Sequence, residues 1–180
     1  MTGQEAIALI HERAWTGRKP GLERTQALLA ALGNPERRLR YVHITGTNGK
    51  GSTAAMTASI LTQAGLRTGL FTSPHLYQFY ERMQVDGVPI SDEDLGRLTE
   101  KVLQAAEGMC DSPTEFELMT AVGMAYFLEQ GCNIVVLEVG LGGRLDSTNV
   151  IPAPEVAVIT NIGLEHTQEL GNTRALIAAE

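Results

Sequence analysis

Residues 43–53 read HITGTNGKGST, and this stretch decides the fold. It joins a short apolar run, residues 41–44, to a segment suited to a helix, residues 52–61. A glycine-rich turn between a strand and a helix, ending in a lysine and a hydroxyl, is typical of a phosphate-binding loop. In such a loop backbone N–H groups, the helix N-terminus and the ammonium group of Lys50 converge on an anion.

The stretch departs from the usual phosphate-loop pattern at two positions. That pattern has a glycine where this chain has Ile44, and it has a hydroxyl directly after the lysine, where Gly51 precedes Ser52. The alternative is a glycine turn that caps a helix, with Lys50 in solvent. Three glycines in six residues would then be an entropic cost without purpose, and a lysine in the first turn opposes the helix dipole unless an anion is bound. The sequence therefore favours a nucleotide phosphate site made by Gly46, Thr47, Asn48, Gly49, Lys50, Gly51 and Ser52.

The composition predicts a folded protein with a sizeable core. The chain has 180 residues, of which 43% are hydrophobic, and its length fits one domain or one domain with an appendage. A net charge of −7 argues against nucleic-acid binding, because there is no excess of positive charge to neutralise phosphates. The start of the chain is too charged for a signal peptide, and no apolar run is long enough for a bilayer. We therefore expect a cytoplasmic protein that binds no membrane, with Cys110 and Cys132 in or near the core.

Helices and strands alternate along the chain, which predicts an α/β fold with a mostly parallel sheet. We expect helices over residues 4–15, 22–32, 92–107 and 118–129 and after residue 173, buried strands over 41–44, 67–71, 133–139 and 156–160, and a hairpin over 80–90 around Asp86-Gly87. The methionines of the helix over 118–129 are expected in the core. Residues 1–40 would form an N-terminal helical segment, and residues 41–180 part of a phosphate-loop ATPase domain.

Two acidic positions have both a structural and a functional interpretation. Glu138 interrupts the apolar strand over 133–139, and a buried carboxylate is costly unless it is paired, hydrogen-bonded or bound to a cation. Beside a phosphate loop, Mg²⁺ is the partner that we favour for Glu138, over a neutral or hydrogen-bonded structural acid. Thr114 and Glu117 have the spacing of a capping box, so helix capping is the favoured role of Glu117.

Three loops follow predicted strands and are expected at the carboxyl edge of the sheet, where ligands bind in open α/β sheets. The first contains Ser73 and His75, which could be plain turn residues. The second contains Arg144 and Asp146, which could form an internal salt bridge. The third contains His166, which could be a capped loop histidine or a contact for metal or phosphate.

These motifs occur together in an order that resembles a known family. GTNGKGS at 46–52, TSPHL at 72–76, LEVGLGGRLD at 137–146 and NIGLEHT at 161–167 resemble the folylpolyglutamate synthase/dihydrofolate synthase family of the Mur ligase superfamily. The resemblance runs from about Gly21 to the end of the chain. The glycine at position 51, between the lysine and the hydroxyl, resembles the folate branch of the superfamily, because the peptidoglycan ligases typically have Ser or Thr directly after the lysine.

The resemblance implies an ATP-dependent ligase that adds L-glutamate to dihydropteroate or folate through an acyl phosphate. Lys50 and the loop backbone would hold the ATP phosphates, and Lys50, Glu138 and His166 would be the catalytic residues. Two Mg²⁺ ions are implied, the first held by Ser73 and Glu138 and the second by His166, and a monovalent cation is a further option. The implied substrate-binding residues are Lys19, Pro20, Thr114, Glu115, Phe116, Glu117, Leu145, Asp146 and Ser147, with Asp146 as a hydrogen-bond acceptor. The family often has an aromatic residue at the position of Glu115.

The length is the main departure from the family. Its members are usually more than twice as long, with a C-terminal domain that contributes to nucleotide and glutamate binding and a lysine, often carbamylated, that helps to hold the second metal. We therefore expect this chain to be a truncated N-terminal piece of a protein that is monomeric at full length, and to be inactive alone. The alternatives are a UDP-muramyl amino-acid ligase of the same superfamily and a nucleotide-binding module without ligase activity.

Overall fold

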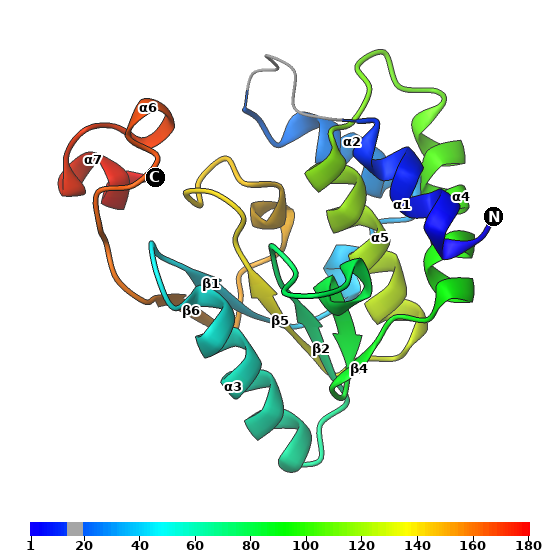
Figure 1. Ribbon diagram of the computed structural model, residues 1–180, viewed down its shortest axis with the longest axis horizontal. Helices are drawn as coiled ribbons and strands as arrows, with labels where there is room; N and C mark the ends of the chain where they lie inside the picture. The colour runs from blue at the N-terminus through cyan, green and yellow to red at the C-terminus, as the bar shows by residue number, and fades with distance from the viewer. Residues whose placement is uncertain (14–19) are drawn as a thin grey trace.

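The computed structural model describes residues 1–13 and 20–180 and shows an α/β fold built on one six-stranded sheet (Figure 1). The strands are β1 (Tyr41–Thr45), β2 (Thr68–Phe71), β3 (Met83–Val85), β4 (Val88–Pro89), β5 (Ile134–Glu138) and β6 (Val156–Ile159), and they lie in the order β4-β3-β2-β5-β1-β6. The four strands β2, β5, β1 and β6 are parallel, and the β3–β4 hairpin adds two antiparallel strands at one edge. The predicted α/β class with a mostly parallel sheet is confirmed.

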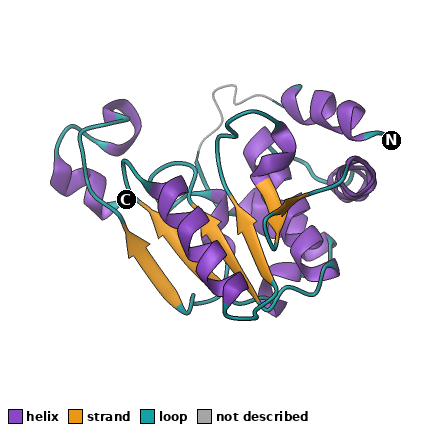
Figure 2. Ribbon diagram, turned by 60° about the horizontal axis from the view of Figure 1, so that its bottom comes forward, coloured by secondary structure: helices purple, strands orange, loops and turns teal. Residues whose placement is uncertain are grey.

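Helices cover both faces of the sheet (Figures 1 and 2). The longer helices are α1 (Gly3–His11), α2 (Glu23–Ala31), α3 (Lys50–Gln63), α4 (Asp92–Ala106) and α5 (Glu115–Glu129). Among the helices of the described residues, α3 alone packs on one face, where Ala54 and Ala58 join Ile44 and Val136 in a small apolar cluster. The other helices lie on the opposite face over a larger core. Because successive residues of a strand point to opposite faces, both clusters draw on the same strands.

Helix α5 is the centre of the larger core. Eleven of its residues are buried, among them Met119 and Met124, as the sequence predicts for these methionines. It lies between the sheet and helices α1, α2 and α4, so it has no polar face. The N-terminal helices α1 and α2 contribute Ala6, Ile10 and Leu28 to this core. Helices α1 and α2 therefore pack in the same layer as α4 and α5.

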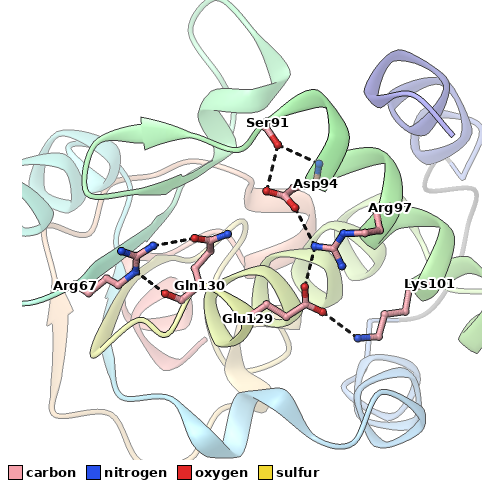
Figure 3. Close-up of polar contacts among 7 residues, drawn as sticks. All are labelled: Arg67, Ser91, Asp94, Arg97, Lys101, Glu129 and Gln130. Carbon is pink, nitrogen blue, oxygen red and sulfur yellow. Dashed lines mark hydrogen bonds and ion pairs between the residues drawn. The ribbon is translucent and has the colours of Figure 1, made fainter.

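Polar contacts hold the outer surface of this layer (Figure 3). Ser91 caps α4 by accepting a hydrogen bond from the N–H of Asp94. Arg97 of α4 lies 2.9 Å from Asp94 and 2.8 Å from Glu129 of α5, and Lys101 lies 3.1 Å from Glu129. Arg97 and Lys101 are about half exposed, so the network positions two helices at little net gain in stability.

Three predictions about the elements were wrong. Tyr80 lies in a single 3-10 turn, η2 (Phe79–Arg82), and the hairpin strand begins only at Met83. Strand β6 is an edge strand in which Val156 is 50% and Ile159 is 61% exposed, while Val158 is half-buried. In the described part of the chain no strand pairs with its outer side and no helix covers it. Cys110 is exposed in a loop, whereas Cys132 is buried as expected.

Short elements complete the chain. They are the 3-10 turns η1 (Pro35–Arg38) and η3 (Ser147–Val150) and the helices α6 (Thr167–Leu170) and α7 (Arg174–Ala179). Helix α7 begins after residue 173 as predicted, and Thr173 caps it by accepting a hydrogen bond from the N–H of Leu176. In the part of the chain that the structure describes, no helix is long and apolar enough to cross a membrane.

Candidate functional site

The candidate site lies at the carboxyl edge of the parallel strands. The loops that leave β1, β2, β5 and β6 all emerge there, because the four strands run in the same direction. This is the edge at which open α/β sheets bind ligands.

The phosphate loop joins β1 to α3 as the sequence predicts. Helix α3 begins at Lys50, so the N–H groups of its first turn point toward the loop. The Lys50 ammonium donates to the carbonyl oxygens of Gly46 at 2.8 Å and Thr47 at 3.3 Å. Asn48, Gly49 and Ser52 are exposed at the rim of this turn. The arrangement places a cation, free N–H groups and the positive end of a helix dipole together, which suits a phosphate.

The loop after β6 holds the phosphate loop in place, a role that the sequence reasoning missed. The N–H of Thr47 donates to the carbonyl of Asn161 at 2.9 Å, and the N–H of Asn48 donates to the Asn161 side chain at 3.1 Å. The hydroxyl of Thr160 donates to the carbonyl of Asn48 at 2.7 Å. A Cβ atom on Gly46 would lie only 2.1 Å from that hydroxyl oxygen, so the close contact requires glycine. The signal available in the sequence was polar residues directly after a strand that ends at this edge.

Glu138 ends β5 beside the phosphate loop. It is 4% exposed, and its Oε2 accepts a hydrogen bond from the N–H of Ser73 at 3.0 Å. A Cβ atom on Gly51 would lie 3.5 Å from the same oxygen. Burial raises the pKa of Glu138, while the Ser73 N–H and the charge of Lys50 act in the opposite direction. The phosphate loop, Ser73 and Glu138, which were predicted to bind ATP and metal, therefore lie next to one another.

The donor set around Glu138 fits a cation that arrives with a nucleotide. Within residues 1–13 and 20–180, no three His, Cys, Asp or Glu side chains group together as a metal site. Mg²⁺ is usually held by one or two carboxylates together with phosphates and waters, so one buried carboxylate beside a phosphate loop is compatible with it. Glu138 and the Ser73 side chain are the groups that would hold such an ion.

A cavity of about 230 Å³ opens in front of the phosphate loop. Gly46, Thr47 and Lys50 line one side of it, and His166 and Glu165 line another. His166 begins α6 in the left-handed conformation, with φ of 48°. The structure thus brings His166 to the same cavity as Lys50, although β1 and the loop after β6 are far apart in sequence.

A second cavity of about 580 Å³ adjoins the first. Seven of the nine predicted substrate-binding residues line it: Pro20, Thr114, Phe116, Glu117, Leu145, Asp146 and Ser147. Lys19 lies outside the described residues. Glu115 points elsewhere, since its carboxylate pairs with His11 at 3.1 Å. The assignment of these residues to substrate binding stays a prediction, but the grouping of distant segments around one cavity supports it.

Phe116 and Glu117 are fixed by different contacts. The Phe116 ring meets Phe71 edge to face and packs so closely on Gly140 that a Cβ atom there would lie 2.7 Å from the ring. Glu117 completes the predicted capping box, because its carboxylate accepts from the N–H of Thr114 at 2.7 Å. It also forms a buried ion pair with Arg24 of α2, at 2.9 Å.

Asp146 is buried and fully hydrogen-bonded within the chain. Its Oδ2 accepts from the N–H groups of Gly140 and Leu141, at 3.1 and 3.0 Å. Its Oδ1 accepts from the N–H of Thr148 at 3.0 Å and from the Thr148 hydroxyl at 2.5 Å. Burial raises the pKa of Asp146, and these hydrogen bonds oppose the rise. A carboxylate offers about four acceptor positions, so a direct bond from Asp146 to a ligand would have to displace one of these donors.

The alternative of an Arg144–Asp146 salt bridge does not occur. The Arg144 guanidinium instead pairs with Glu180 at 2.7 Å. His75, in the loop after β2, accepts a hydrogen bond from Arg82 at 2.9 Å. This contact agrees with a structural role for His75 in the turn.

Fold and site together define an α/β domain with a phosphate-loop turn at the carboxyl edge of its sheet and an adjoining second cavity. Comparison with family models agrees: the Mur ligase middle domain matches residues 44–180. The chain belongs to the Mur ligase family.

Known relatives carry folate-ligase names. The chain is 47% identical over 182 residues to the dihydrofolate synthase/folylpolyglutamate synthase of Bacillus subtilis, covering 98% of this chain and 42% of that protein. The solved FPGS–AMPPCP–folate complex superposes with a TM-score of 0.94 at 41% identity, covering 98% of this chain and 44% of the other. Folylpolyglutamate synthase of Mycobacterium tuberculosis, solved with ADP and AMPPCP, gives a TM-score of 0.87 at 38% identity, covering 97% and 39%. The chain thus spans less than half the length of these relatives.

Proposed function

We propose that the protein carrying this chain is an ATP-dependent ligase that joins L-glutamate to dihydropteroate, to a folate, or to both. The observation that carries the proposal is the pair of adjoining cavities, one bounded by the phosphate loop and the other by the predicted substrate residues. Gly140, Leu141 and Gly142 line both cavities, so a nucleotide and an acid bound in them would meet at this wall. The relatives support this assignment, because one was solved with an ATP analogue and folate together.

The reaction needs two anions to approach each other. A substrate carboxylate oxygen attacks the γ-phosphorus of ATP, and the bond to the bridging oxygen of ADP breaks, which gives an acyl phosphate. The amine of L-glutamate then attacks the acyl carbon, loses a proton and expels phosphate. The protein's task is to hold the reactants and to neutralise charge, as is typical of phosphoryl transfer.

Each residue that we assign has a place in this scheme. Lys50 and the loop N–H groups would hold the β- and γ-phosphates, with Ser52 at the helix start. Ser73 and Glu138 would hold a Mg²⁺ ion, which supplies charge neutralisation when bound, and His166 would contribute to a second. Phe116, Leu145 and Ser147 would line the acid-binding cavity.

The test is ADP release by the full-length protein. We expect release that requires both a pteroate-type acid and L-glutamate, with mass spectrometry detecting the product amide. ADP release driven by a UDP-linked muramyl acid would instead identify a peptidoglycan ligase. Nucleotide binding without turnover on either acid would identify a binding module.

A further inference from the structure

The wall between the two cavities is the segment Gly140-Leu141-Gly142, which lines both of them. This wall is hydrogen-bonded to β1, the strand that ends in the phosphate loop. Thr45 and His43 lie two residues apart and therefore face the same side of the sheet. The Thr45 hydroxyl donates to the carbonyl of Gly142 at 2.6 Å. His43 reaches the same wall through two further side chains. Neither residue is among the predicted site residues.

The second anchor is a chain of buried hydrogen bonds. His43 Nε2 lies 2.9 Å from the hydroxyl oxygen of Thr148, which is fully buried. That hydroxyl lies 2.5 Å from Asp146, whose other oxygen accepts the N–H groups of Gly140 and Leu141. The chain therefore runs from β1 to the backbone of the wall through three side chains.

The direction of these hydrogen bonds follows from counting protons. Three of the four donors to Asp146 are backbone N–H groups, which favour its carboxylate form. The Thr148 hydroxyl must then donate its single proton to Asp146, and its oxygen is free to accept. Burial lowers the pKa of His43 to about 4, so the ring is neutral and carries one N–H. That proton belongs on Nε2, donated to Thr148.

We propose that His43 is a positioning residue: by donating from Nε2 to Thr148, it orients Asp146 and thereby fixes the Gly140–Leu141 backbone that separates the nucleotide from the acid substrate. The inference rests on the proposed function for its kinetic consequence. The anchoring itself depends only on the geometry. Buried polar chains of this kind hold one arrangement when every member is satisfied.

The test compares two substitutions at His43 in the full-length protein. His43→Phe keeps a planar ring and removes the donor, whereas His43→Gln keeps an N–H near the Nε2 position. We expect His43→Phe to raise the KM for the pteroate-type acid by about tenfold or more, since small misplacements at a reacting centre are costly. The KM for ATP should change by less than about threefold, because the phosphate loop has its own contacts to Asn161. His43→Gln should restore the KM for the acid to near its original value.

A second measurement is independent of the ligase reaction. The amides of Gly140, Leu141 and Thr148 donate to Asp146, so His43→Phe should speed their hydrogen exchange by about tenfold while amides of α4 are unchanged. Thr148→Val should act in the same way, because it removes the central hydroxyl. Thr99→Val, an equally buried threonine in α4, is the matched control and should leave both exchange and KM unchanged.

The outcomes separate the two ideas. Unchanged exchange in both His43→Phe and Thr148→Val would refute the anchoring. Faster exchange with unchanged KM values in an active ligase would refute the positioning role and leave His43 merely structural. If the unmodified protein ligated no acid, the proposed function would fail, and the exchange data would still decide the anchoring.

Discussion

The Lys50 ammonium lies against two carbonyl oxygens of its own loop, Gly46 and Thr47, and faces a cavity large enough for phosphate groups. We expect Lys50→Ala to weaken binding of AMPPCP by about tenfold to a hundredfold, the usual value of a hydrogen bond to a charged group. Isothermal titration calorimetry measures the change. Lys101→Ala, at an exposed lysine on α4, is the control and should bind normally. Equal affinity in Lys50→Ala and the unmodified protein would refute the role assigned to Lys50.

His43 also predicts how stability depends on pH. Its pKa is about 4 in the folded state because of burial, against 6.5 for an unperturbed histidine. The unfolded chain therefore binds an extra proton between these values, and folding stability falls as the pH drops from 6.5 to 4. Between pH 7 and pH 4.5, we expect the free energy of unfolding to fall by about 2 kcal/mol less in His43→Gln than in the unmodified protein. Urea unfolding at pH 7, 5.5 and 4.5 measures this difference. Parallel pH profiles for the variant and the unmodified protein would contradict the assignment.

The positions of residues were predictable where a short motif carried them. The phosphate loop, the position of Glu138 beside it and the grouping around Phe116 follow from local sequence and from the rule that parallel strands end at one edge. The His43–Thr148–Asp146 chain could not be predicted, because His43 and Thr148 are 105 residues apart and neither has a motif of its own. Such a pair depends on strand order and register, which the sequence pattern alone leaves open.

Among the elements, helices with clear caps were predicted well, and the exposure of the edge strand β6 was predicted wrongly. Ser91, Thr114 and Thr173 each cap a helix, as their side chains and spacing indicate. Strand β6 was expected to be buried because its sequence, VAVI, is apolar. Its position at the sheet edge decides its exposure, and apolar content carries no information on that position.

Arg24, at the contact between α2 and α5, should contribute more to stability than Arg97, at the contact between α4 and α5. Arg24 is 13% exposed and pairs with Glu117, which is 3% exposed. Arg24→Met leaves a buried carboxylate without its cation, so we expect a loss of about 3–5 kcal/mol in the free energy of unfolding. Arg97→Met breaks an exposed pair between α4 and α5 and should cost about 1 kcal/mol or less. Urea denaturation measures both, and similar costs for the two variants would contradict the assigned difference in burial.

At the scale of the whole molecule, the class of fold was predictable and the arrangement of the strands was not. Alternation of strands and helices indicated a mostly parallel sheet, but the order β4-β3-β2-β5-β1-β6 places β1 between two strands that follow it by about 90 and 110 residues. This arrangement puts the loops after β1, β5 and β6 next to one another. The candidate site is therefore a product of strand order as much as of its motifs.

The contact between Asn161 and the phosphate loop has a consequence for local unfolding. Strand β6 pairs with β1 on one side only, so it is expected to fray more readily than the inner strands. Fraying of β6 would release Asn161 and with it the backbone of Asn48. By thermodynamic linkage, a nucleotide that needs the ordered loop must then protect the amides of β6, including those of Val156, Ala157 and Val158, which do not line the cavity in front of the phosphate loop. Saturating AMPPCP should therefore slow hydrogen exchange in residues 156–159, and an exchange rate independent of AMPPCP would show that the edge strand and the loop open separately.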